Sequence, residues 1–122
     1  MTNFVVVGLG GFLGAAARYG VTLLVATFWT REFPLATFLI NVTGSFVLGY
    51  FSTLAAERLD VDPRLRLLVA TGFVGAYTTF STFEYETQRL TEVGALWWGL
   101  ANVVTSVVVG YAAVQLGVRL AR

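Results

Sequence analysis

The sequence contains no cysteine, no histidine and no lysine, and only 12% of its 122 residues are charged. The absence of cysteine excludes a disulfide framework and any thiolate metal site. A net charge of +1 gives no basis for binding nucleic acid or another polyanion. A soluble globular domain usually has about 25% charged residues, so the low charge content argues against a soluble protein.

Hydrophobic residues, in contrast, make up 57% of the chain. The few charges are clustered: apart from Arg18, they fall at 31–32, 57–66, 84–92 and 119–122. The apolar stretches between these clusters are about as long as the roughly 20 residues that a helix needs to cross a bilayer. A soluble helix would instead carry a charged face in every turn or two.

We therefore predict an all-α membrane protein with one domain, residues 1–122, and four transmembrane helices. The expected spans are 3–28, 34–56, 67–89 and 95–116. Short loops make successive helices antiparallel neighbours. Both termini and the second loop then share one side of the membrane. That side has more arginines, which favours cytoplasmic termini; they are Arg58, Arg64, Arg66, Arg119 and Arg122, against Arg31 and Arg89 on the other side.

Polar side chains recur on one face of two expected spans, although polar groups in hydrocarbon are costly without a partner or a watery cavity. On the second span, Thr37, Asn41 and Ser45 follow one another every four residues. On the fourth, Asn102 and Ser106 have the same spacing. Interhelical hydrogen bonds explain either set alone. Two such stripes in so small a protein favour a polar path through the membrane.

The third expected span has its hydroxyl and glycine residues concentrated at 71–83. Two glycines and adjacent threonines predict a helix that breaks near its middle. Carbonyls freed at such a break are tolerated at membrane depth only when they are buried in protein or line a cavity. Carbonyl ends of half-helices can also hold a cation.

Phe80 and Phe83 lie three residues apart among these hydroxyls and share a helical face. Packing is the ordinary explanation for such a pair. An aromatic ring is, however, positive at its edge, so rings edge-on to a hydroxyl-lined groove can attract a small anion without trapping it, as conduction requires. Two ionisable residues remain open to either interpretation. Arg18 either snorkels to an interface or concentrates anions at a vestibule, and Glu86 either caps the polar path or ends the helix.

Other functions fit the sequence less well. Ser81 has no histidine to act as its base, and Glu84 and Glu86 point to different helix faces, so we expect no enzyme. A small multidrug antiporter also has four short helices and dimerises, but it needs a carboxylate in the first span, where this chain has Arg18. A non-transporting scaffold bundle would not need hydroxyl stripes beside paired aromatics.

Three segments resemble, in order, the signatures of the CrcB/Fluc fluoride channels. They are GFLGAAARY at 11–19, TFLINVTGS at 37–45 and TGFVGAYTTFSTF at 71–83. The number and length of the expected spans also match, and the run TTFSTF is highly specific. The chain departs from the family pattern at Ala36 and Ala76, where glycine is frequent.

The resemblance implies a passive fluoride channel: an antiparallel homodimer in the lipid of a prokaryotic plasma membrane, with two pores along the subunit interface. Phe80 and Phe83 would face the anion, and Asn41 would donate a hydrogen bond into the same path. Backbone carbonyls of Gly75 and Thr78 from both subunits would hold a central structural sodium ion. Further polar groups would lie near or along the pore, and with those singled out above they are Arg18, Thr37, Ser81, Thr82, Glu86, Asn102 and Ser106.

Overall fold

The computed structural model describes residues 1–58 and 60–122, so Leu59 of the second loop lies outside the described residues. Throughout these two ranges the chain is helical apart from short connections, and no strand is present. The elements are α1 (Thr2–Ala26), α2 (Leu35–Thr53), the π-helical η1 (Leu54–Arg58), α3 (Pro63–Arg66), the π-helical η2 (Leu67–Val74), α4 (Gly75–Tyr77), α5 (Phe80–Glu92) and α6 (Leu96–Ala121).

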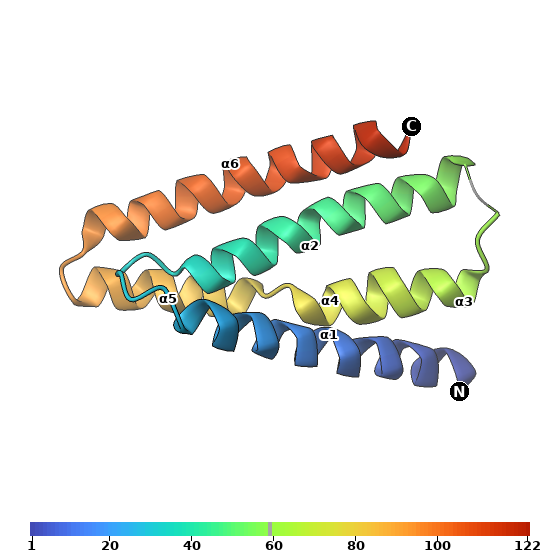
Figure 1. Ribbon diagram of the computed structural model, residues 1–122, viewed down its shortest axis with the longest axis horizontal. Coiled ribbons are helices and arrows are strands. Elements are labelled where there is room, and N and C mark those ends of the chain that lie inside the picture. The colour runs from blue at the N-terminus through green and yellow to red at the C-terminus, as the bar shows by residue number, and fades with distance from the viewer. Residues whose placement is uncertain (59) are drawn as a thin grey trace.

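These elements form four antiparallel rods (Figure 1). Among the described residues, three helices are long and apolar enough to cross a membrane: α1, α2 with η1, and α6. The chain is thus a multi-pass membrane protein, as the sequence predicted, with α6 extending five residues past the expected end of the fourth span. The third rod, 63–92, is assembled from four shorter elements.

The ends of the rods agree with the expected topology. Both termini and the loop before α3 lie at one end of the molecule, and the loops at 29–33 and 93–95 lie at the other (Figure 1). Asp62 caps α3 by accepting the Arg64 amide hydrogen at 2.8 Å. Gly94 closes α5 with a φ of 80°, a conformation that glycine adopts without the cost a side chain would add.

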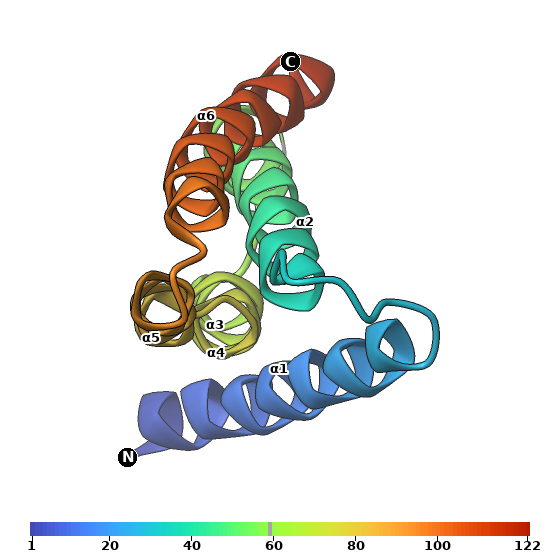
Figure 2. The same cartoon turned by 90° about the vertical axis from the view of Figure 1, so that its left-hand side faces the viewer.

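Glycines set how closely the rods approach. Along the contact of α2 with α6, a Cβ added at Gly49 would lie 2.6 Å from the Val114 carbonyl oxygen, and one added at Gly117 would overlap the carbonyl of Phe46. The two backbones therefore touch, as small residues allow in membrane helices. α6 also packs along α5, so that α2, α5 and α6 lie together when the rods are viewed end-on (Figure 2).

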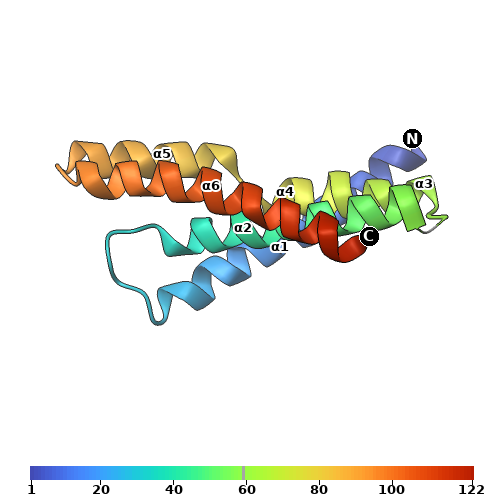
Figure 3. The same ribbon diagram turned by 90° about the horizontal axis from the view of Figure 1, so that it is seen from above.

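α1 crosses the other side of the third rod, away from α6 (Figures 2 and 3). Its contact runs along η2 and α4 and depends on Gly10 and Gly14, which lie four residues apart and so share one face of α1. A Cβ on Gly10 would overlap the carbonyl of Leu68, and one on Gly14 the carbonyl of Phe73. The glycine-lined face of α1 therefore rests directly on the backbone of the third rod.

Candidate functional site

The third rod is interrupted at two threonines. α4 ends at Tyr77, Thr78 is extended with φ −79° and ψ 156°, and Thr79 is extended with φ −149° and ψ 114°. α5 then begins at Phe80, with the Thr79 hydroxyl accepting the Thr82 amide hydrogen at 3.2 Å as an N-cap. The Thr78 amide still donates to the Val74 carbonyl at 3.0 Å, but the Thr79 amide and carbonyls beside the interruption lack helical partners and need others.

Asn41 supplies partners for the backbone of Thr79. Its Oδ1 accepts the Thr79 amide hydrogen at 2.8 Å, and its Nδ2 donates to the Thr79 carbonyl at 3.0 Å. One side chain on α2 therefore satisfies both backbone groups of Thr79. The sequence predicted that Asn41 donates into the anion path; the second N–H of its amide is still available for that.

Several carbonyls lose their helical donors in the same arrangement, among them those of Gly75 and Thr78. In a continuous helix the Thr79 amide would donate to the Gly75 carbonyl, and the Thr82 amide to the Thr78 carbonyl. Here the first amide donates to Asn41 and the second to the Thr79 hydroxyl. The carbonyls of Gly75 and Thr78 are thus free of these bonds, and Gly75 lies exposed on the protomer surface.

Of the two carbonyls between these, the carbonyl of Ala76 has a partner from α1. Arg18 Nε donates to the Ala76 carbonyl at 3.2 Å. Arg18 is half-buried against the third rod, and it is not among the residues that line the groove described next.

A groove of about 290 Å³ runs beside the interruption, between α2, the start of α5 and α6. We call it the aromatic groove. Its lining combines apolar walls with an amide, hydroxyls and two aromatic rings; the residues are Asn41, Gly44, Ser45, Leu48, Val74, Thr78, Thr79, Phe80, Phe83, Ser106 and Val107.

The two phenylalanines of the aromatic groove differ in exposure. Phe80 is 73% exposed and Phe83 only 7%. Their ring centroids are 5.9 Å apart and their planes are inclined by 55°, so the rings do not stack and the edge of one can turn toward the space beside the other. A buried and an exposed ring at one groove suit a site that is completed by another surface.

Behind the aromatic groove, a chain of hydrogen bonds links α6 to α5. Ser106 Oγ donates to Asn102 Oδ1 at 3.3 Å, and Asn102 Nδ2 donates to Thr87 Oγ1 at 3.0 Å. The Thr87 hydroxyl in turn donates to the Phe83 carbonyl at 2.9 Å. Asn102 is 1% exposed, so it lies inside the protomer, while Ser106 reaches the groove.

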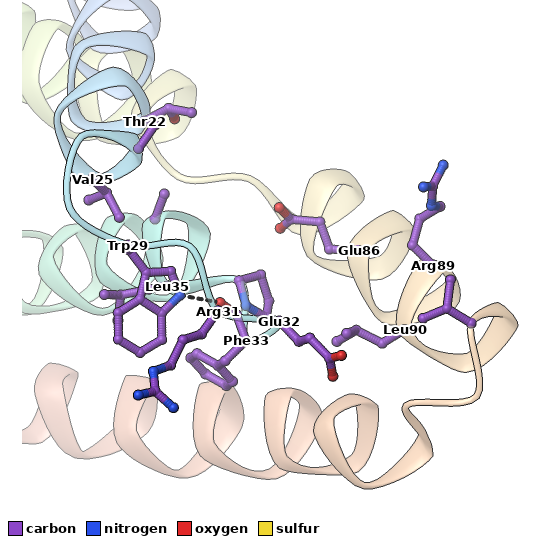
Figure 4. Close-up of a pocket in the computed structure, with 14 residues that line it drawn as sticks. Thr22, Val25, Trp29, Arg31, Glu32, Phe33, Leu35, Glu86, Arg89 and Leu90 are labelled. Carbon is purple, nitrogen blue, oxygen red and sulfur yellow. Dashed lines mark hydrogen bonds between the residues drawn. The ribbon is translucent and has the colours of Figure 1, made fainter.

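A second cavity, of about 390 Å³, lies where the loop between α1 and α2 meets α5. We call it the loop cavity. The carboxylate of Glu86 points into it, whereas the guanidinium of Arg89 points away (Figure 4). Glu86 Oε1 is shielded from solvent and has no hydrogen-bond partner among the described residues, although the buried Thr37 lies beside this carboxylate.

The structure therefore unites part of the predicted site. Asn41, Phe80, Phe83 and Ser106 line the aromatic groove. Glu86 lines the loop cavity, with Thr37 beside its carboxylate. Thr82 accepts a hydrogen bond from the Thr79 hydroxyl at the N-terminus of α5. Ser81 is exposed on the surface of α5.

Sequence reasoning missed Thr79 and Thr87. Thr79 matters through its hydroxyl, which caps α5, and through its backbone bonds to Asn41, which a pattern of side-chain types does not reveal. Thr87 has a weak signal in the sequence, because it lies four residues after Phe83 and therefore on the same helical face.

Comparisons with known proteins agree on one family. The family model described as CrcB-like protein, Camphor Resistance (CrcB), matches residues 5–118. A protein of Solibacter usitatus named fluoride-specific ion channel FluC is 44% identical over 120 residues, which cover 98% of each chain. Proteins with the same name from Ruminiclostridium cellulolyticum and Koribacter versatilis are 42% and 48% identical. They cover 100% and 88% of this chain, and 94% and 86% of their own.

Proposed function

The chain belongs to the CrcB-like family, and from that premise we propose that it is a fluoride-selective channel that lets fluoride leave the cell passively. The relatives named above carry the name fluoride-specific ion channel FluC and match nearly the whole chain. The function is transport across a membrane and not catalysis. As the relatives are bacterial, the membrane is the plasma membrane of a prokaryote.

The aromatic groove is the observation that carries this proposal. Phe80 and Phe83 bring two aromatic rings, and Asn41 and Ser106 bring an amide and a hydroxyl, to one lined space. All of these groups can offer partial positive charge to a small anion. The lining contains no lysine or arginine, so the anion meets weak, repeated sites, which lets it enter and also leave.

We propose that an antiparallel homodimer completes the path. The support is exposure: Phe80 is 73% exposed beside the groove, and a large exposed ring on a polar-lined face suits a surface that another subunit covers. Two copies related by a twofold axis in the membrane plane would form two equivalent pores. The single channel domain, 1–122, would be surrounded by lipid on its remaining apolar faces.

The third rod would then act as one transmembrane helix broken at its middle. Residues 63–92 include the charged ends Arg64 and Glu92, and the extended Thr78 and Thr79 lie between them. In this proposal α3, η2 and α4 form one half of the span and α5 the other.

A structural sodium ion fits the backbone at this break. Sodium is a hard cation and prefers oxygen ligands, as calcium and magnesium do. The carbonyls of Gly75 and Thr78 have no helical donor, since the amides that would bond them donate elsewhere. In an antiparallel dimer the two subunits would contribute four carbonyls, which would bind the ion and join the subunits.

The alternative of a proton-coupled small multidrug antiporter has no matching residue. Such a protein binds cationic drugs and protons at a carboxylate in its first span, and α1 contains no aspartate or glutamate. The ionisable side chain that α1 carries at membrane depth is instead the cationic Arg18.

Reconstitution tests the proposed function directly. Purified protein in liposomes loaded with potassium fluoride should release fluoride to an ion-selective electrode once valinomycin balances the charge. Release should need neither a proton gradient nor a sodium gradient. Chloride-loaded liposomes should release far less anion. Transport of a cationic dye driven by protons, without fluoride release, would instead support the antiporter.

A further inference from the structure

We infer that Arg18 is a positioning residue for the break in the third rod, and that it acts through the hydrogen bond from its Nε to the Ala76 carbonyl. This role differs from concentrating anions at a vestibule. It bears on the proposed function because the break carries both the groove and the proposed sodium ligands. The contact itself lies within one protomer and does not depend on the dimer.

One face of α1 delivers the guanidinium to this carbonyl. Gly10, Gly14 and Arg18 follow one another every four residues and so share that face. The two glycines rest on the backbone of η2, and one turn further along Arg18 meets the end of α4 with an Nε to oxygen distance of 3.2 Å. Ala76 lies close to α1, since a Cβ added at Gly11 would lie 3.9 Å from the Cβ of Ala76.

The hydrogen bonds at the break show why this carbonyl needs a donor. The interruption removes the helical partners of several backbone groups, and an unpaired group at membrane depth is costly. Asn41 satisfies both groups of Thr79, and Arg18 satisfies the Ala76 carbonyl. The carbonyls of Gly75, Tyr77 and Thr78 have no hydrogen-bond donor among the described residues. Asn41 from α2 and Arg18 from α1 thus hold the break from two sides and leave its remaining carbonyls for a cation.

Charge is the competing explanation. The run from α3 to α4 ends at Tyr77, and a cation near the C-terminus of a helix is favourable without any hydrogen bond. Substitutions can distinguish the two explanations, because the donor is Nε and a neutral side chain can also place a donor there. A glutamine places its Nε2 the same number of bonds from the backbone as arginine places Nε, so it keeps the donor and removes the charge. Methionine is an unbranched side chain that removes both the donor and the charge, while lysine keeps the positive charge.

The test is amide hydrogen exchange in lipid nanodiscs, which requires no fluoride transport. In Arg18→Met the amides of residues 78–82 should exchange about tenfold faster, as expected when a hydrogen bond from a charged group is lost. In Arg18→Gln the exchange should stay within about twofold of the wild type. Arg119→Met, a change at an exposed arginine on α6, should leave exchange at 78–82 unchanged.

Each outcome decides the inference. If the amides of residues 78–82 stay protected in Arg18→Gln, the result supports positioning by the donor. This holds even if Arg18→Met fails to assemble. Loss of protection or of assembly in Arg18→Gln, with Arg18→Lys protected, would assign the role to charge and overturn the inference. Unchanged exchange in Arg18→Met would overturn it too. Fluoride efflux from the same preparations tests the channel proposal separately from the role of Arg18. A wild-type protein without efflux would refute the channel, but the exchange result for Arg18 would still hold.

Discussion

The side chain of Asn41 binds the peptide groups of Thr79 on both sides, accepting from its N–H at 2.8 Å and donating to its carbonyl at 3.0 Å. The two residues lie on different rods, 38 positions apart in the sequence. This pairing joins α2 to the start of α5 and fixes one wall of the aromatic groove. It also makes Asn41 a structural residue as well as a candidate ligand for the anion.

Changing Asn41 to aspartate tests both roles. The carboxylate still accepts from the Thr79 amide but no longer donates to its carbonyl. It also repels fluoride: at ~4 Å and an effective dielectric constant of about 20, like charges repel by roughly 4 kcal/mol. If this repulsion fell wholly on the barrier, the rate would drop about a thousandfold. We expect almost no efflux from Asn41→Asp liposomes at pH 8.

Asn3→Asp is the matched control for this change, since Asn3 is exposed at the start of α1. It should conduct like the wild type. Undiminished efflux from a folded Asn41→Asp protein would remove Asn41 from the path.

The aromatic groove predicts a second result. Replacing Phe80 or Phe83 by isoleucine keeps apolar bulk and removes the ring edge that would face the anion. We expect each single variant to lose fluoride efflux by at least about tenfold, equivalent to ~1.4 kcal/mol on the barrier. Phe83→Ile should also lower thermal stability, because Phe83 is buried while Phe80 is exposed.

The control for Phe80→Ile is Phe12→Ile on α1. Phe12 is 72% exposed and Phe80 73%, but Phe12 is not part of the groove lining. Both variants should fold. Efflux equal to that of the wild type in Phe80→Ile and in Phe83→Ile would return the two rings to a packing role.

The hydrogen bonds behind the groove predict an effect on stability. Thr87→Val removes the hydroxyl that accepts from Asn102 Nδ2 and leaves a buried donor unpaired, at a cost of about 1–3 kcal/mol. We expect a lower unfolding temperature in detergent for Thr87→Val and near wild-type stability for Thr87→Ser. Thr105→Val is the control, since among the described residues the Thr105 hydroxyl bonds only to the Ala101 carbonyl of its own helix. Equal stability of all three variants would contradict a role for this chain of hydrogen bonds.

Much of this architecture could be predicted from the sequence because hydrocarbon restricts what a chain can do. The positions of the rods followed from the length of the apolar runs between charge clusters. Gly10 and Gly14, where α1 touches the third rod, have the spacing of small residues that allows close helix contact, although this spacing does not identify the partner rod. The extended residues Thr78 and Thr79 lie within the segment 71–83, and a single transmembrane helix broken there stays a prediction.

The partners of individual polar groups could not be predicted in the same way. Arg18 donates to a carbonyl 58 positions away, and Asn102 to a hydroxyl on another rod. Such pairs depend on the relative rotation of two packed helices, which the spacing of residues along one helix does not determine. The division of the polar residues between the aromatic groove and the loop cavity has the same origin.

The free carbonyls at the break lead to the last prediction, which concerns sodium. If Gly75 and Thr78 of both subunits hold the ion, sodium should stabilise the dimer and should not drive transport. Replacing sodium by N-methylglucamine should increase the fraction of monomer in dilute detergent, measured by crosslinking. The ligand at Thr78 is the carbonyl in this proposal, and the hydroxyl already donates to the Val74 carbonyl at 3.0 Å. Thr78→Ala should therefore keep the response to sodium. If Thr78→Ala loses the response to sodium, the hydroxyl and not the carbonyl is the ligand. Uphill fluoride movement driven by a sodium gradient would exclude a passive channel.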